Sequence, residues 1–159
     1  TYLIDSQLGE GGMGKVYLAR HTRIDNKRFA VKVLNAEYAK HGEVLERFKR
    51  EAETTALISS PHVIGVYDVG ATPDGRPFIA SDYLEGEELA DRLERDSQLS
   101  VAETVRIARQ VCAGLTAAHQ QGVIHRDIKP ENVFLVGPKD TSVAKIIDFG
   151  ISRLADQSG

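Results

Sequence analysis

The sequence predicts an α+β fold, with a strand-rich first half that contains one helix and a helix-led second half. Short segments of alternating polarity, separated by polar turns, dominate the first 83 residues, whereas the strongest helical periodicity lies at residues 100–121. The character of the chain changes at residues 84–88. We therefore expect two structural parts, residues 1–83 and residues 84–159.

Three predicted strands open the chain, at residues 2–8, 16–20 and 28–34. A glycine-rich turn at residues 9–14 separates the first two. Because these connections are short, the strands should pair as an antiparallel meander, since parallel strands need a long crossover.

One helix and two further strands complete the predicted first half. The helix is expected at residues 43–58, and "SSP" ends it. The strands are expected at residues 63–69 and 77–83, with the turn "ATPDGR" between them. The residues that recur at helical spacing in the helix are Val44, Phe48, Ala52 and Thr55.

The second half is predicted to begin with a short helix at residues 89–95. A long helix follows at residues 100–121, where Ser100 and Glu103 have the spacing of a capping box. The apolar stripe of this long helix consists of Val101, Val105, Ala108, Cys112 and Leu115. Two short strands come after it, at residues 133–136 and 143–147.

Composition narrows the class of protein. A net charge of −3 gives no broad basic surface, so we expect no nucleic-acid partner. The single cysteine, Cys112, excludes an intramolecular disulfide and favours a reducing, cytoplasmic setting. No signal peptide or membrane-spanning run is visible, but both ends read as cuts in a longer protein, whose membrane anchoring therefore stays open.

Three glycines, Gly9, Gly11 and Gly14, fit the pattern G-x-G-x-x-G. Taken alone, the pattern is also typical of an ordinary hairpin turn. A dinucleotide-binding fold would need a helix directly after the glycines, and here an alternating strand follows. Glycines between two strands can still let backbone N–H groups approach phosphate oxygens closely.

Lys32 and Glu51 are candidates for an ion pair. Lys32 shares a strand face with Ala30 and Leu34, and Glu51 lies within the mainly apolar stripe of the first helix. A carboxylate at such a position should be paired, because an isolated buried charge is costly. Spacing alone also allows the two residues not to pair with each other. Lys32 would then lie on an edge strand and reach water, and Glu51 would contact Arg47 or Thr55.

Polar residues also gather at two turns beside the last strands. Asp127 and Asn132 lie five residues apart, and Asp148 ends an apolar strand in "KIIDFG". Hard oxygen ligands that leave room for phosphate oxygens suit Mg²⁺. One such aspartate is usually a turn residue, but three residues of this kind at neighbouring turns favour a metal site.

In these motifs the chain resembles the eukaryotic-type serine/threonine protein kinases, most closely their bacterial branch. "GEGGMGKV", "AVK", "HRDIKPEN" and "DFG" occur in the family's order. The resemblance implies a two-lobe kinase fold, with a five-stranded antiparallel N-lobe that carries one helix. Residues 84–159 would form the first, mainly helical part of the C-lobe, without the later helices, which would cover one face of the long helix.

The resemblance also implies roles for individual residues. Lys32 would hold the ATP phosphates and pair with Glu51, Asp127 would be the catalytic carboxylate, and Lys129 would steady the γ-phosphate. Asn132 and Asp148 would hold Mg²⁺ or Mn²⁺. The nucleotide-binding residues would be Leu8, Gly9, Glu10, Gly11, Gly12, Gly14, Val16, Ala30, Lys32, Ser81, Asp82 and Leu84.

The implied function is transfer of the ATP γ-phosphate to Ser or Thr hydroxyls of proteins. The fragment itself is expected to bind nucleotide without efficient transfer. Two alternatives are a kinase-like module that only binds nucleotide or a partner, and a small-molecule kinase. The complete set Lys32, Glu51, Asp127, Asn132 and Asp148 disfavours the first, and "DIKPEN" disfavours the second.

Overall fold

The computed structural model describes residues 2–11, 14–23 and 27–149, apart from the side chains of Arg47 and Glu51. The described residues divide into two compact units, which are treated separately below. The first unit comprises residues 2–56 and Gly65–Tyr83, and the second comprises Leu57–Ile64 and residues 84–149. Residues 57–64 thus belong to the second unit, although they precede residue 84 in the chain.

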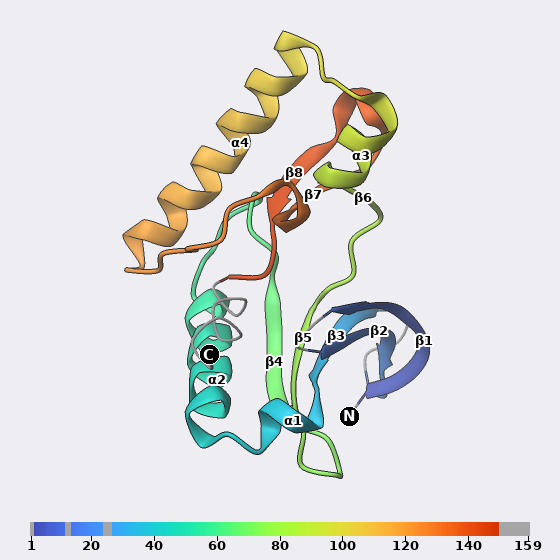
Figure 1. The fold of residues 1–159 in the computed structure, drawn as a ribbon, viewed down its shortest axis with the longest axis vertical. Helices are drawn as coiled ribbons and strands as arrows, with labels where there is room; N and C mark the ends of the chain where they lie inside the picture. Colours follow the sequence, from blue (N-terminus) through green and yellow to red (C-terminus); the bar gives the residue numbers. More distant parts are fainter. Residues whose placement is uncertain (1, 12–13, 24–26, 150–159) are drawn as a thin grey trace. The chain divides into compact units, whose positions relative to one another are not determined.

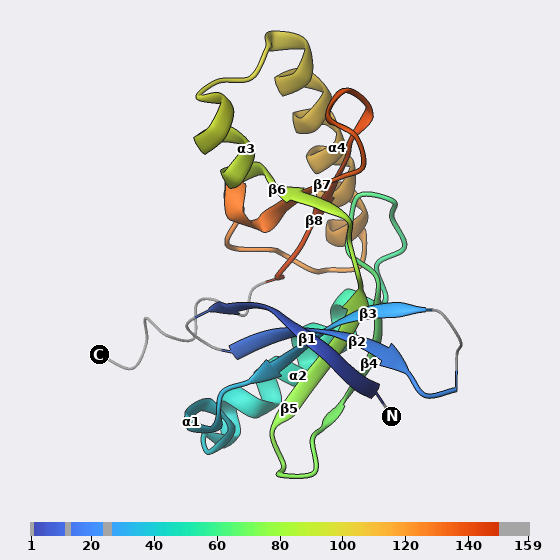
Figure 2. The ribbon, with the colours of Figure 1, turned by 90° about the vertical axis from the view of Figure 1, so that its right-hand side faces the viewer.

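The first unit is built on a five-stranded antiparallel sheet, as the sequence predicts (Figure 2). The spatial order is β1-β2-β3-β5-β4, so the first three strands form the expected meander. The third strand has the predicted bounds. The strands are β1 (Tyr2–Gly11), β2 (Gly14–His21), β3 (Arg28–Leu34), β4 (Val66–Ala71) and β5 (Pro77–Asp82).

Each face of this sheet buries its own apolar cluster, because successive residues of a strand point to opposite faces. On one face, Phe29 and Val31 of β3 pack with Ala80 and with the Tyr2 ring. On the other face, Leu34 packs with residues of α2 (Gly42–Ala56), which lies along β4 (Figure 1). The α2 residues Phe48, Ala52 and Thr55 are buried, as their helical spacing predicts.

The structure corrects three predictions for the first unit. A short helix, α1 (Ala36–Ala39), precedes α2, so the unit has two helices within its described part and not one. β1 continues through the predicted glycine turn as far as Gly11, because Gly9 and Gly11 pair with β2. The strand predicted from residue 63 begins only at Val66, because Val63 forms an isolated bridge with Ile146.

The second unit combines two helices with a small three-stranded sheet, ordered β6-β7-β8. The backbone of His62 and Ile64 closes the outer edge of β8 by hydrogen bonds with Ile146. The first strand of this sheet lies outside the strands that the sequence predicts. The elements are β6 (Gly86–Glu88), α3 (Leu89–Asp96), α4 (Val101–Gln120), β7 (Val133–Val136) and β8 (Val143–Ile146), with single 3₁₀ turns at Pro130–Asn132 and Lys139–Thr141.

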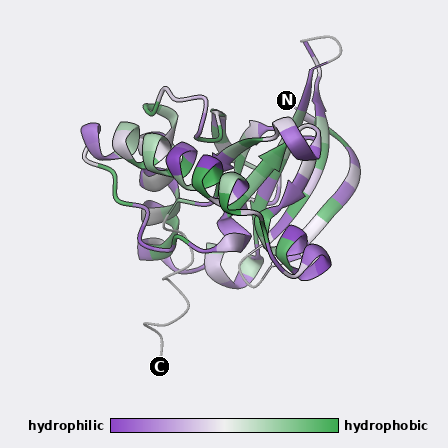
Figure 3. Cartoon of the chain, turned by 90° about the horizontal axis from the view of Figure 1, so that it is seen from above, coloured by the Kyte–Doolittle hydropathy of each residue, from purple (hydrophilic) through white to green (hydrophobic). Residues whose placement is uncertain are grey.

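The long helix α4 begins where its cap predicts, since the Ser100 hydroxyl accepts a hydrogen bond from the Glu103 N–H. Helices of the chain carry hydrophobic and hydrophilic residues side by side (Figure 3). The predicted apolar stripe is, however, largely exposed: Val101 is 81% and Val105 51% accessible. The residues of α4 that the structure buries against the rest of the unit are Ile107, Gly114 and Ala118.

Gly114 allows α4 to approach the segment at residue 62 closely. A Cβ at this position would lie 2.7 Å from the His62 carbonyl oxygen and 3.0 Å from Ile146 Cδ1. Gly114→Ala should therefore lower the free energy of unfolding by about 1–3 kcal/mol through overpacking, although alanine is the better helix former by about 1 kcal/mol. Urea unfolding followed by circular dichroism measures the change.

Gly42→Ala, in the first turn of α2, is the matched control. A Cβ there would contact nothing within 4 Å, so this variant should be neutral or slightly stabilised. Equal or greater stability of Gly114→Ala than of the unmodified chain would contradict the packing described above.

Candidate functional site

In the first unit, four predicted site residues share one face of the sheet. Val16 pairs with Lys32 across β2 and β3, and Ala30 pairs with Ser81 across β3 and β5. Residues directly opposite each other in an antiparallel pair point to the same side. Because Ala30 and Lys32 are two residues apart on β3, both pairs lie on the same face.

Ser81 is half-buried on this face of the sheet, and its side chain is held in place by a neighbouring strand. Its hydroxyl donates a hydrogen bond to the Ala30 carbonyl at 3.2 Å. The next residue, Asp82, ends β5, and its carboxylate accepts hydrogen bonds from the Gly65 N–H (3.0 Å) and the Tyr67 hydroxyl (2.7 Å). Leu84, the last predicted nucleotide contact, belongs to the second unit.

The glycine motif lies at the β1–β2 hairpin. Gly9 and Gly11 have open space where a Cβ would stand, whereas a Cβ at Gly14 would meet the Val33 carbonyl. The first two glycines thus leave room above the strand, and the third is required by packing. Beside them, Leu8 is exposed and Lys15 forms an ion pair with Glu10 at 3.4 Å. Gly12 lies outside the described residues.

Lys32 is half-buried in the middle of β3. Glu51 lies in α2, between the turns that carry the buried Phe48 and Ala52, but its side chain is outside the described part of the chain. The ion pair between Lys32 and Glu51 therefore stays a prediction.

In the second unit, three predicted site residues meet in the loop before β7. The Asn132 amide donates hydrogen bonds to both the Asp127 backbone carbonyl (2.8 Å) and its carboxylate (3.0 Å). The Lys129 ammonium lies 3.4 Å from the same carboxylate. The turn at Pro130–Asn132 brings these residues together, because it reverses the chain directly after Lys129.

His125 connects this loop to the strand that precedes Asp148. Its Nδ1 accepts a hydrogen bond from the Asp127 N–H (3.2 Å), so its Nε2 carries the proton and donates to the Ile147 carbonyl (2.9 Å). The ring is buried against Phe149, with centroids 4.7 Å apart. Burial lowers the pKa of His125 below its ordinary value, which keeps the ring neutral.

Asp148 is placed by the end of β8. The Ile147 N–H donates to the Asn132 carbonyl at 3.0 Å, which ties the residue before Asp148 to the predicted metal ligand of the loop. Asp148 itself has a φ of +53°, in the left-handed region that few residues other than glycine adopt. The negative charge of Asp148 also contributes to raising the pKa of Glu88, after burial and the effect of Asp91.

The donor atoms fit a magnesium ion bound together with phosphate oxygens. Since the Asn132 amide nitrogen donates to Asp127, the amide oxygen is the atom of Asn132 that could act as a ligand, and the carboxylate of Asp148 would be the second protein ligand. Mg²⁺ commonly takes one or two protein carboxylates and completes its shell with water and phosphate. Among the residues described, no cluster of three or more His, Cys, Asp or Glu side chains suited to a metal occurs.

The fold and this arrangement define a protein kinase domain. The chain belongs to the protein kinase domain family, whose model matches residues 2–159. Protein kinases as a class use ATP and a divalent metal. The sequence and the family model thus agree on the fold.

Among its relatives are serine/threonine-protein kinases of bacteria. The chain is 40% identical to pkn3 of Myxococcus xanthus, with 99% of the chain and 29% of the relative covered. It is 37% identical to PknB of Mycobacterium tuberculosis, with 99% and 25% covered. The crystal structure of the PknI kinase domain of M. tuberculosis matches with a TM-score of 0.82 at 35% identity, covering 95% of this chain and 60% of that one.

The chain therefore spans less than a third of the length of these curated relatives and about 60% of the PknI kinase domain. Within the part of the chain that the structure describes, no helix has both the length and the apolar character needed to cross a membrane.

The neutral state of His125 predicts a pH dependence of stability. Because the folded-state pKa is below the ordinary value of 6.5, the unfolded chain binds the proton first as the pH falls. The stabilisation is complete above about pH 6.5 and is lost as the pH falls through the folded-state pKa, at no more than about 1.4 kcal/mol per pH unit. Thermal unfolding between pH 7.5 and 5 measures it.

His125→Gln should remove this part of the pH dependence, and His119→Gln is the matched control. His119 is exposed in the last turn of α4, so its replacement should leave the slope of stability against pH close to that of the unmodified chain. Parallel pH profiles for His125→Gln and the unmodified chain would contradict the role of the buried neutral ring.

Proposed function

We propose that the chain contains the nucleotide site and catalytic loop of a serine/threonine protein kinase, which transfers the ATP γ-phosphate to a Ser or Thr hydroxyl of a protein. One observation carries the proposal. The carboxylate of Asp127 accepts a hydrogen bond from Asn132 and lies beside the Lys129 ammonium, in a loop that is tied by His125 to the strand before Asp148. The names of the bacterial relatives support the assignment to Ser and Thr.

In this proposal the residues of the loop divide the work of phosphoryl transfer. Asp127 accepts the proton of the attacking hydroxyl, and its orientation is held by Asn132. Lys129 places positive charge where the transferring phosphoryl group carries negative charge. Asn132 and Asp148 hold the metal, which when bound neutralises charge on the phosphate oxygens.

The first unit would hold the nucleotide. Val16 and Ala30, on the same sheet face as Lys32 and Ser81, provide the apolar surface for adenine. Lys32 provides the positive charge for the phosphates, and the open space above Gly9 and Gly11 lets the hairpin backbone approach them. We further propose that the site works in the cytoplasm, where ATP is available. The second substrate, which accepts the phosphate, would be a protein.

A module that binds nucleotide without catalysis is the second candidate, and it requires the same nucleotide site. The intact set of Asp127, Lys129 and Asn132, with Lys129 and Asn132 both on the Asp127 carboxylate, favours the enzyme. In the parent protein, Asp127→Asn should lower phosphate transfer from radiolabelled ATP to Ser/Thr peptides by about a hundredfold or more. Nucleotide affinity should be retained in the same variant.

Binding of nucleotide should depend on magnesium and on Asp148. We expect titration of a fluorescent ATP analogue into the chain to show Mg²⁺-dependent binding, weakened about tenfold or more by Asp148→Asn, since the metal would lose its charged protein ligand. Asp74→Asn makes the same chemical change in the exposed turn between β4 and β5, and should leave the affinity within about twofold. Absence of Mg²⁺-dependent binding in the unmodified chain would refute the proposal.

The small side chain of Ser81 should give bulky ATP-site inhibitors unusual access behind adenine. Ser81→Met should weaken such compounds by about tenfold or more, corresponding to roughly 1–3 kcal/mol of overpacking. The affinity for the ATP analogue should change by less than about twofold, because in the proposed site Ser81 borders the space behind adenine and not adenine itself. A panel of bulky compounds that binds both proteins equally in competition titrations would contradict this role of Ser81.

A further inference from the structure

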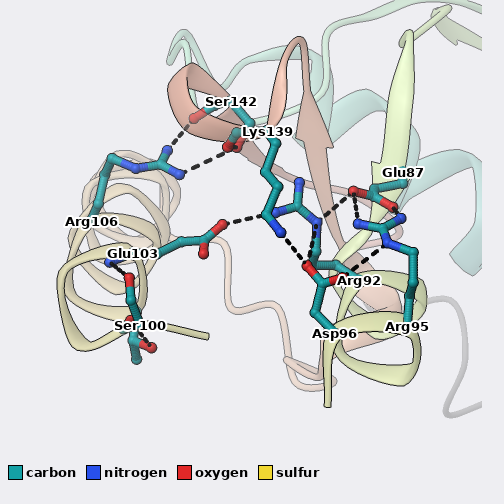
Figure 4. Close-up of polar contacts among 10 residues, drawn as sticks. Glu87, Arg92, Arg95, Asp96, Ser100, Glu103, Arg106, Lys139 and Ser142 are labelled. Carbon is teal, nitrogen blue, oxygen red and sulfur yellow. Dashed lines mark hydrogen bonds and ion pairs between the residues drawn. The ribbon is translucent and has the colours of Figure 1, made fainter. Parts of the chain in front are cut away.

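A buried arginine links the elements of the second unit outside the site described above. Arg92, on α3, is 2% accessible and forms ion pairs with Glu87 of β6 (2.6 Å) and Glu103 of α4 (2.9 Å), with Asp96 at 3.8 Å (Figure 4). Its neighbour Arg95 binds Glu87 as well, at 2.5 Å, but is 54% accessible.

The cluster balances its charges. Three carboxylates (Glu87, Asp96 and Glu103) face three cations (Arg92, Arg95 and Lys139). A guanidinium does not lose its proton in proteins, so a buried arginine must be paired, and removal of one partner leaves an uncompensated charge. Hydrogen bonds from Arg95 and Arg92 lower the pKa of Glu87 to about 2, so this carboxylate is ionised at all ordinary pH values.

Glu87 connects the charged cluster to the small sheet. It lies in β6, which pairs with β7 and is further held by the Gly137 N–H bond to the Glu85 carbonyl. Because strand residues alternate, Glu88 points to the opposite side from Glu87. There it experiences the negative charges of Asp91, Asp148 and Glu131.

We propose that Arg92 is a positioning residue of the nucleotide site, acting through Glu87 to fix β6 and the chain that leads into it from Leu84. This inference rests on the proposed function, in which Asp148 holds the metal, and on Leu84 as one of the nucleotide contacts that the kinase resemblance implies. Glu87 joins the strand to the cluster on one side, and Glu88 pairs with Phe134 of β7, two residues after the predicted metal ligand Asn132. The Arg92 ion pair therefore determines how β6 presents Leu84 and Glu88 to a bound nucleotide.

A purely structural role for Arg92 makes a different prediction. If Arg92 only joined α3 to α4 through Glu103, its replacement would lower the melting temperature and leave the nucleotide affinity of the folded molecules unchanged. If Arg92 positions β6, the affinity of the folded molecules falls as well. Replacement of Arg95 separates the effect of a buried position from the effect of charge alone. Arg95 has the same partner, Glu87, and the same charge as Arg92, but its side chain is exposed.

The experiment compares Arg92→Met with Arg95→Met in the full chain. The dissociation constant of the Mg²⁺-bound fluorescent ATP analogue is measured at a temperature where circular dichroism shows each variant to be fully folded. We expect Arg92→Met to weaken binding by about tenfold, the low end for partners that orient a site. Arg95→Met should stay within about twofold of the unmodified chain. Glu87→Gln, which keeps the side-chain shape, should reproduce the loss and decides the matter if Arg92→Met does not fold.

Either of two results would overturn the inference. One is a dissociation constant within twofold of the unmodified chain for folded Arg92→Met or, if that variant does not fold, for Glu87→Gln. The other is an equal loss in Arg95→Met, which would show an effect of charge alone. Failure of the unmodified chain to bind the analogue would instead reject the proposed function, so the two failures are distinguishable.

Discussion

The geometry of the proposed catalytic loop depends on one buried side chain, that of His125. With Nδ1 as acceptor and Nε2 as donor, a single neutral ring joins the backbone of Asp127 to the backbone of Ile147, which are far apart in sequence. A protonated ring would have a proton on both nitrogens and could no longer accept the bond from Asp127. Burial against Phe149 therefore serves the site, because it keeps the ring in the one state that makes both contacts.

Hydrogen bonds to the backbone also place the proposed metal and catalytic residues. The Ile147 N–H donates to the Asn132 carbonyl, parallel to the connection made by His125. Arg126 and Asp148, which follow directly after the bridged residues His125 and Ile147, both have positive φ (+68° and +53°). Such conformations persist only where the surroundings determine them, and they are concentrated at functional sites.

The sequence was sufficient for features that depend on local pattern. The alternation in β3, the spacing of Phe48 and Ala52 in α2, and the Ser100 cap of α4 all predicted what the structure shows. It failed where contacts with distant parts of the chain determine where a strand begins or ends. The glycine pattern read as a turn, but pairing with β2 extends β1 to Gly11, and Val63 joins Ile146 instead of β4.

Polar side chains become buried by different routes, as His125 and Arg92 show. Histidine can be buried by losing its charge, so His125 needs only one donor and one acceptor from the backbone. Arginine cannot, so Arg92 must gather carboxylates from β6, α3 and α4 before its burial becomes tolerable. Nothing in the local pattern of α3 distinguishes buried Arg92 from exposed Arg95, since the difference lies in Glu103, which another helix supplies. A buried charge cluster of this kind depends on residues from three elements at once. The local sequence pattern of any one element therefore does not predict it.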